Sequence, residues 1–320
     1  MKRLPSLPGA QALWVLAVLA VLTPLGLDSF YTNVATQVLI FALAAMSLDI
    51  LMGYTGFPSL GHAGFFGVGA YTVGLVTVRY FSNLWIVLLL GVLAGCVVSA
   101  LVGILALRTR GGAFLMTTLA LGQVLWAIAF GWNSVTGGDD GLPGISRPPW
   151  GLPWSLGETD TFYYLVLSIF AVASFLMWRI VKSPFGLALM GIRDSEERMK
   201  ALGHDVGRQK LLAFVIAGTF AALAGGLFAY KQTFINPDSA IGLVLSAELF
   251  LMVIIGSPGT LVGPAFGAAG LVVLESTLSE YTERWEFVLG LIFVIIALSA
   301  PDGLHRALGG TFSKVRARRA

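Results

Sequence analysis

Four ionisable side chains lie within long apolar runs of the sequence, where a charge is costly and is usually retained for a function. They are Asp49, His62, Glu248 and Glu275. Asp49 and His62 flank the segment GYTGFPSLG at 53–61, whose Gly and Pro residues predict an interrupted helix. Such an interruption exposes backbone polar groups, and a helix N-terminus favours a carboxylate. The chemistry that this pattern offers is the binding of a zwitterionic solute.

Each of these side chains also has a plainer role. A buried His is more often hydrogen-bonded to a backbone carbonyl than bound to a ligand, and we expect that role for His62. Asp49 and Glu275 equally fit positions near the lipid headgroups, and Glu248 fits the membrane interface. Neutral polar groups in the run at 113–132 offer either solute contacts or hydrogen bonds between helices. The candidates for a translocation path are Asp49, Gly56, Ser59, His62, Thr117, Gln123 and Glu248.

The sequence contains no pattern typical of an enzyme active site. There is no G-x-S-x-G, no H-E-x-x-H and no P-loop G-x-x-x-x-G-K-[ST]. No second His or Cys stands at metal-ligand spacing, and the single Cys96 forms no disulfide within the chain. We therefore expect no catalytic residue, no metal and no cofactor bound by this chain, and a membrane-embedded enzyme is the least favoured function.

The elements that position these residues are long apolar helices. The chain is 57% hydrophobic and 12% charged, whereas a soluble domain is nearer 45–50% and about 25%. Runs of about 20 apolar residues predict membrane helices. The sequence thus predicts an all-α polytopic membrane protein, one transmembrane domain over 1–320, in which the short, Gly-broken run at 244–257 is a full span, a half-helix or a re-entrant element. The ten runs are 10–27, 33–52, 62–80, 84–107, 113–132, 162–181, 209–231, 244–257, 260–277 and 286–300.

The distribution of positive charge predicts the orientation of these helices. With ten crossings and both termini in the cytoplasm, 16 of the 20 Lys and Arg residues fall on the cytoplasmic side, as the positive-inside rule requires. The basic tail at 306–320 is then a cytoplasmic anchor beside the lipid bilayer, and no nucleic-acid partner is expected. The loop at 133–161 is extracytoplasmic, and its length fits either a plain solvated loop or a binding or gating role.

Two Gly- and Pro-containing segments resemble each other at an offset of 200 residues. LMGYTGFPSLGHAGFFG at 51–67 and LMVIIGSPGTLVGPAFG at 251–267 share Leu, Met, two Gly, Pro and Phe at equivalent positions. Paired interrupted segments in two halves of a membrane protein are typical of a translocation site.

A charge-dense stretch, KSPFGLALMGIRDSEERMKALGHDVGRQK at 182–210, separates two apolar runs. Ser183-Pro184 predicts one helix start, with a capping hydroxyl, and Asp194 with Glu197 predicts a second in the manner of a capping box. Gly203 predicts the stop of this second helix, expected over 195–202. A helix this short needs a partner to be stable. The stretch is either a solvated linker, which composition alone favours, or a docking element, and Met199 and Leu202 would share its apolar face.

Here the sequence resembles a family. The pattern S-P-F-G-x-A-L-x-x-I-R-x-x-E-x-x-x-x-A-L-G that begins at Ser183 is similar to the cytoplasmic loop of LivM-type permeases of branched-chain amino-acid ABC transporters. Three further stretches, at 48–72, at 110–123 followed by 136–145, and at 248–268, resemble the same family in the same order. The resemblance implies that the loop at 183–203 is a coupling helix for an ATPase. Arg193, Ala201, Leu202 and Gly203 match the family pattern, whose acidic position falls in the Glu196–Glu197 pair, and Asp194 and Lys200 are added on charge alone.

The resemblance also implies partners. They are a homologous second permease (LivH-like), two cytoplasmic ABC ATPases that bind ATP-Mg, and an extracytoplasmic solute-binding protein. The expected function is import of branched-chain or related amino acids across the bacterial inner membrane by alternating access. Permeases for urea or short amides look similar, and a secondary transporter or channel acting alone is the alternative from another class.

Overall fold

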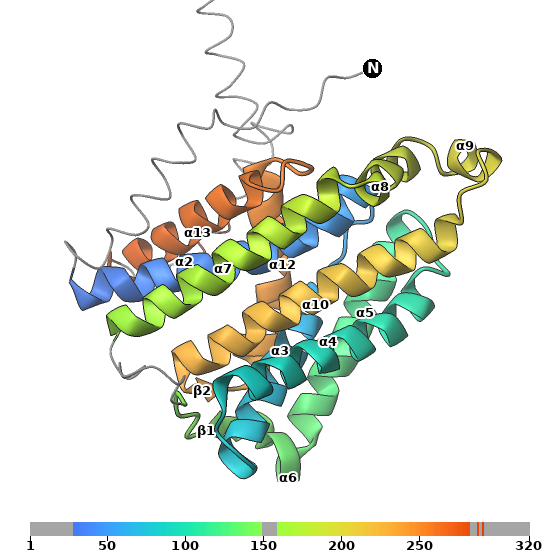
Figure 1. Ribbon diagram of the computed structural model, residues 1–320. Helices are drawn as coiled ribbons and strands as arrows, with labels where there is room; N and C mark the ends of the chain where they lie inside the picture. Colours follow the sequence, from blue (N-terminus) through green and yellow to red (C-terminus); the bar gives the residue numbers. More distant parts are fainter. Residues whose placement is uncertain (1–27, 149–158, 282–286, 288–289, 291–320) are drawn as a thin grey trace, which may run out of the picture.

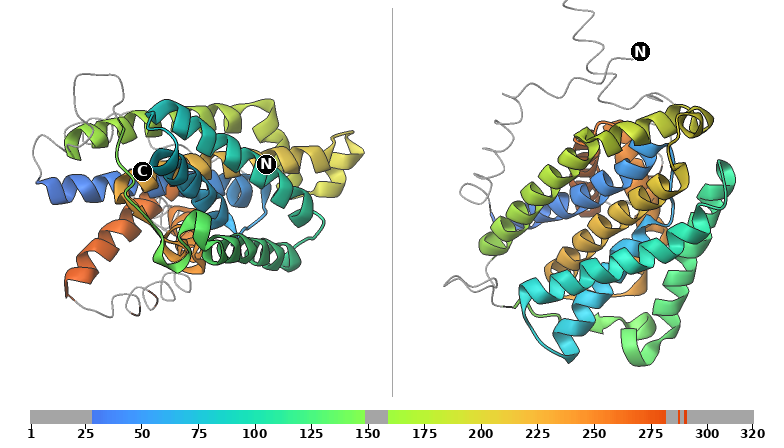
Figure 2. Two further views of the ribbon diagram at one scale, coloured as in Figure 1. Left: turned by 90° about the horizontal axis from the view of Figure 1, so that it is seen from below. Right: turned by 45° about the vertical axis from the view of Figure 1, so that its right-hand side comes forward.

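The computed structural model describes residues 28–148 and 159–281, together with residues 287 and 290, and within these ranges the chain is an all-α bundle (Figure 1). Helix α10 packs against α2, α3 and α4, while α2 also contacts α7 and α13. Figure 2 shows the same arrangement from two further sides. The longer helices are α2 (Ser29–Asp49), α3 (His62–Arg79), α4 (Leu84–Ala106), α5 (Gly112–Gly131), α7 (Thr159–Lys182), α10 (Val206–Gln232), α12 (Leu243–Gly256) and α13 (Gly263–Tyr281).

Six helical segments in the described ranges are long and apolar enough to cross a membrane, which confirms an all-α multi-pass membrane protein. They are Ser29–Thr55, Leu84–Ala106, Gly112–Gly131, Thr159–Lys182, Val206–Gln232 and Pro237–Gly256. Two further predicted runs form the shorter α3 and α13. The predicted run at 10–27 and most of the run at 286–300 lie outside the described residues, as does the tail at 306–320.

Small residues let α10 approach its neighbours closely. Gly69 of α3 and Gly95 of α4 both lie directly against Ala222 of α10, so neither position has room for a side chain. Gly225 of α10 lies in the same way against the backbone of Phe66. Because lipid tails are as apolar as the helices, such close van der Waals packing is what holds membrane helices together.

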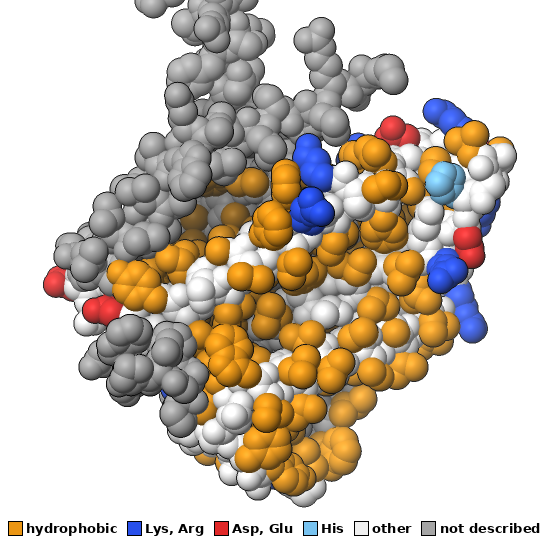
Figure 3. Space-filling model, viewed as in Figure 1, with side chains coloured by type: hydrophobic (Ala, Val, Ile, Leu, Met, Phe, Trp, Pro, Cys, Tyr) orange, Lys and Arg blue, Asp and Glu red, His pale blue; other side chains and the backbone are white. Residues whose placement is uncertain are grey.

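The outer surface divides into an apolar band and one basic end. Exposed apolar side chains of α4 and α5, such as Leu93, Leu101 and Val124, face outward. Figure 3 shows Lys and Arg gathered at the end that carries α8 (Pro184–Asp194) and α9 (Glu196–Ala201). The Lys and Arg residues of the helix ends and loops there are Arg108, Arg110, Arg179, Lys182, Arg193, Arg198, Lys200, Arg208 and Lys210; the opposite end of the described bundle carries Arg79, Arg147 and Lys231.

The opposite end is closed by short elements. The segment 133–148 forms α6 (Asn133–Thr136), the 3-10 helix η2 (Gly138–Asp140) and strand β1 (Leu142–Pro143). β1 pairs antiparallel with β2 (Phe234–Ile235), and α11 (Pro237–Ile241) follows β2. Arg147 donates a hydrogen bond to the Tyr230 carbonyl at 3.0 Å and lies 4.2 Å from the Phe162 ring centre. Burial there lowers the pKa of Arg147. This half of the predicted loop at 133–161 is therefore attached to the bundle rather than freely solvated.

Candidate functional site: two helix breaks and a charged loop

The first break follows α2 and comprises the π-helix η1 (Ile50–Thr55) and residues 56–61. The N–H groups of Gly56 and Phe57 both donate to the Leu51 carbonyl, and Gly56 has a φ of +79°, which a glycine adopts at little cost. α3 then starts at His62. The interrupted helix predicted from GYTGFPSLG is confirmed, and π-helical turns of this kind occur often at functional sites.

The second break, residues 257–262, separates α12 from α13. The non-helical part of the first break lies between Thr55, the end of η1, and His62, and that of the second lies between Gly256 and Gly263, an offset of 201 residues. Both breaks carry the Pro of the sequence repeat, at Pro58 and Pro258, while its first Gly lies in the first break as Gly56 and ends α12 as Gly256. The resemblance between 51–67 and 251–267 thus coincides with two helix–break–helix units.

Asp49 joins the two breaks. Its carboxylate is fully buried and accepts hydrogen bonds from the N–H groups of Gly259 at 2.7 Å and Leu261 at 2.9 Å. Gly53 lies so close to Asp49 and Gly259 that a β carbon would not fit. Asp49 is therefore buried inside the protein, where it links the end of α2 to the second break.

His62 stands at the start of α3, also fully buried. Its Nε2 lies 2.8 Å from Ser47 Oγ, whose single proton has the Ala44 carbonyl at 2.6 Å as acceptor. Ser47 thus accepts from Nε2–H, and Nδ1 is the unprotonated nitrogen. The partner of His62 is a hydroxyl and not the backbone carbonyl that we expected. His62 Nδ1 and Ser59 Oγ are both buried without a hydrogen-bond partner among the described residues.

Helix α5 contacts the first break through one face. Leu60 N–H donates to Thr118 Oγ1 at 3.3 Å, and Gly61 lies directly against the Thr118 carbonyl. Thr117, one residue earlier, instead bonds to Ala113 and Thr109 within its own end of the bundle. The structure thus brings Thr118 to the break and leaves Thr117 away from it, because two adjacent residues of a helix face different sides.

The remaining acidic candidates occupy different places. Glu248 is half-buried in α12. Glu275, in α13, interacts electrostatically with Lys231, whose ammonium also donates to Gln37 Oε1. Lys231 lies near the end of α10 opposite α9, so Glu275 is distant from the two breaks. Gln123 is half-buried in α5.

The charged stretch folds as two short helices, α8 and α9. Both predicted helix starts are confirmed, but neither predicted cap is. Ser183 Oγ donates back to the Ile180 carbonyl and makes no cap bond to α8, and Ser195 rather than Asp194 caps α9 by accepting from Arg198 N–H at 3.3 Å. The second helix is therefore shorter than predicted, Glu196–Ala201. Gly203 has a φ of +86° and ends it as expected.

The two helices differ in how they meet the bundle. α8 buries Gly186, Ala188, Leu189 and Ile192, whereas α9 buries no residue. Met199 packs on Gly191 of α8, but Leu202 remains 70% exposed. The expected shared apolar face of Met199 and Leu202 is wrong, since one side chain faces α8 and the other faces away. Asp194, Glu197, Ala201 and Gly203 are exposed.

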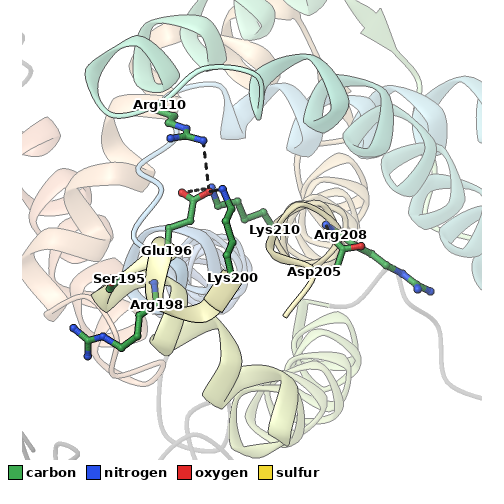
Figure 4. A network of polar contacts seen from close by, with 8 residues as sticks. All are labelled: Arg110, Ser195, Glu196, Arg198, Lys200, Asp205, Arg208 and Lys210. Carbon is green, nitrogen blue, oxygen red and sulfur yellow. Dashed lines mark hydrogen bonds and ion pairs between the residues drawn. The ribbon is translucent and has the colours of Figure 1, made fainter. Parts of the chain in front are cut away.

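Glu196 anchors α9 through ion pairs (Figure 4). Its carboxylate lies 2.7 Å from Lys210 Nζ, 3.3 Å from Lys200 Nζ and 4.0 Å from Arg110. The pair with Lys200 joins residues one helical turn apart, as spacing in the sequence indicates, whereas the contacts with α10 and the α4–α5 loop join segments that spacing does not relate. Partial burial acts to raise the pKa of Glu196, but the hydrogen bonds and charges of Lys210 and Lys200 outweigh it and hold this pKa below its usual value.

Arg193 and Lys210 extend from this loop region to the first break. Arg193 donates to the Gly53 carbonyl, and its Cγ lies against Gly56. Lys210 is nearly buried, and its ammonium lies 4.4 Å from the centre of the Phe57 ring. The charged loop, the π-helix and the second break thus form one connected group of residues.

This combination defines a class: a polytopic α-helical membrane protein with paired interrupted helices and a charged loop at one end. Residues 30–297 match the family described as "Branched-chain amino acid transport system / permease component", and the chain belongs to that family.

Several characterised permeases are similar to this chain along most of its length. The high-affinity branched-chain amino acid transport system permease protein LivM of Salmonella typhimurium is 29% identical, over 94% of this chain and 77% of its own. The autoinducer 2 import system permease protein LsrC of Photorhabdus laumondii is 28% identical over 91% and 90%. A tyrosine transport system permease protein of Clostridioides difficile is 24% identical over 88% and 95%. No solved structure gives a significant match.

Proposed function

We propose that this chain is the membrane-spanning permease subunit of an ATP-driven importer for branched-chain or related amino acids. The observation that carries the proposal is the family match over residues 30–297, together with similarity to LivM over 94% of the chain. The interrupted helices support it, because broken helices in two halves of a transporter are where solute sites form.

The chain itself is non-catalytic, and two separate cytoplasmic ATPases bind and hydrolyse ATP-Mg. The absence of a P-loop from the sequence supports this division. The α8–α9 end is cytoplasmic, as are both termini in a ten-crossing topology, and the cations gathered at that end favour this orientation. The membrane is the bacterial inner membrane.

The coupling surface is α9 with its exposed neighbours. A six-residue helix with no buried side chain is marginal alone, so a partner that packs on it would stabilise it. The exposed Leu202 supplies an apolar contact, and Asp194, Glu197 and Arg198 supply charges around it. ATP-driven closure of the ATPases moves this loop and switches access to a pathway between this chain and a second, homologous permease. An extracytoplasmic binding protein delivers the solute.

The path candidates at the first break differ in their availability to a solute. Asp49 is already occupied by backbone N–H groups of the second break, whereas Ser59 Oγ and His62 Nδ1 are buried polar atoms with no hydrogen-bond partner in the described chain. We place a polar contact for the solute at Ser59 and His62, with Gly56, Thr117, Gln123 and Glu248 as further candidates.

The docking proposal is tested by matched substitutions at the two ends of the molecule. Leu202→Ser removes an exposed apolar side chain from the end of α9, and Tyr80→Ser removes one, 78% exposed, from the opposite end. We expect Leu202→Ser to lower co-purification of the ATPase and Tyr80→Ser to leave it unchanged. Replacement of 194–203 by a Gly/Ser linker should abolish co-purification of the ATPase. ATPase binding that survives this linker, or solute uptake by the chain alone in ATP-free liposomes, contradicts the proposal.

The solute is identified through the partner binding protein, in which selectivity is expected to reside. Its thermal melting is measured with leucine, isoleucine, valine and tyrosine, and separately with urea, acetamide and autoinducer 2. A rise in Tm with the branched-chain amino acids supports the proposal, whereas a rise confined to the second group overturns the solute assignment.

A further inference from the structure

The first break contains a backbone carbonyl that its own helix cannot satisfy. The Gly53 carbonyl would accept from residue 57 in an α-helix or from residue 58 in a π-helix. Phe57 N–H is used by Leu51, and Pro58 has no N–H. An unpaired buried carbonyl costs about 1–3 kcal/mol, so this position requires a donor from elsewhere in the fold.

Arg193 is that donor. It stands next to the last residue of α8, and its guanidinium hydrogen-bonds to the Gly53 carbonyl. Gly56 and Gly259 make room for it, because a β carbon at Gly56 would come within 2.7 Å of Arg193 Cγ and one at Gly259 within 3.1 Å of its NH1. Arg193 therefore occupies the junction where both breaks meet.

A second contact links α9 to the same break through Lys210 of α10. Lys210 lies between Glu196 Oε2, at 2.7 Å, and the Phe57 ring, at 4.4 Å from its centre. Phe57 also packs edge-to-face on Phe114 of α5. Lys210 is only 5% exposed, so these two partners take the place of the water that would otherwise surround its ammonium.

We propose that Arg193 and Lys210 are positioning residues that fasten the α8–α9 loop to the first break at two points, Gly53 and Phe57. A displacement of the loop then moves the break as a unit. Asp49 carries that displacement to the second break through its bonds to Gly259 and Leu261. This inference rests on the proposed function, because it identifies which side chains convert loop movement into a change at the helix breaks.

The test uses the complete transporter in liposomes, with three measurements: co-purification of the ATPase, ATP hydrolysis, and uptake of radiolabelled leucine. In Arg193→Gln we expect assembly and ATP hydrolysis to persist while leucine uptake per ATP falls by about tenfold, the change expected from losing one charge-assisted hydrogen bond. Arg193→Lys keeps the positive charge but lacks the planar guanidinium. It should restore part of the leucine uptake per ATP hydrolysed. Arg179→Gln, an exposed cation of α7 at the same end, should leave the ratio unchanged.

Lys210→Met tests the second contact. It also keeps the inference testable if Arg193→Gln does not fold and therefore does not assemble. It should also lower uptake per ATP hydrolysed with ATPase binding intact. An unchanged ratio in both variants overturns the inference. So does loss of ATPase binding in an otherwise folded Arg193→Gln, because Arg193 would then act at the ATPase surface. Failure of the proposed function is distinct, since the unsubstituted complex would then show no ATP-dependent uptake.

Discussion

Helices α8 and α9 are neighbours in sequence but are held in opposite ways. α8 inserts four residues into the bundle, including Leu189, which is fully buried. α9 buries none and is attached by the ion pairs of Glu196 and by Met199 on α8. Apolar burial is short-ranged and stable, whereas a partly exposed ion pair contributes little and is screened by salt. We call α8 the base of this loop and α9 its tip. Burial fixes the base in the bundle, whereas ion pairs attach the tip weakly.

The largest effect is expected from breaking the base. Leu189→Asp places an unpaired charge in a fully buried site of α8 and should destabilise the fold by about 3–5 kcal/mol. The measurement is the Tm and the yield of folded chain in detergent. Leu187→Asp, at a site of the same helix that is 57% exposed, is the control and should change Tm little. Equal losses at both positions would show that α8 is not seated as described.

An intermediate effect is expected from releasing the tip. Glu196→Gln leaves the nearly buried Lys210 without its carboxylate, which costs roughly 1–3 kcal/mol locally. A spin label at Leu202→Cys, in a Cys96→Ala background, should become mobile in this variant while Tm changes little. Glu197→Gln, the exposed neighbouring carboxylate, is the control and should leave the label as it is.

The same ion pairs give a pH dependence. Because the pKa of Glu196 is held below its usual value, the attachment of α9 is fully present above the ordinary Glu pKa of about 4.3 and is lost as pH falls through the lowered value. The spin label at position 202 should therefore keep its restricted spectrum from pH 8 to about pH 5 and mobilise in stronger acid. Mobilisation on going from pH 8 to pH 6 would contradict this attachment.

The smallest effect is expected at the end of the tip. Gly203→Ala forces a side chain into a φ of +86° and should weaken the α9 stop by about 1 kcal/mol. Gly207→Ala, in the first turn of α10, should instead stabilise slightly, because alanine is the better helix former. Hydrogen exchange of the amides of 196–207 distinguishes the two effects. Exchange should become faster in Gly203→Ala and slower in Gly207→Ala.

Much of the helical fold follows from the sequence because its signals are local. Apolar runs locate α2 to α5, α7, α10, α12 and α13 within a few residues, and Gly and Pro locate both breaks. Ser183-Pro184 and Gly203 mark the limits of the charged stretch for the same reason. No local feature of the sequence predicts that η1 is a π-helix, because a π-turn depends on how the rest of the fold holds the ends of the helix.

The tertiary structure decided what the breaks contact. Asp49 meets Gly259 and Leu261 more than 200 residues away, and Glu196 pairs with Lys210 as well as the Lys200 that helical spacing indicates. Composition and spacing establish which residues are polar and which helix carries them, but a pairing between distant segments is set by how whole helices pack. The sequence by itself therefore determined the helices, their interruptions and the charged loop; the packing of α8 and α10 against the first break decided that Arg193 and Lys210 reach it.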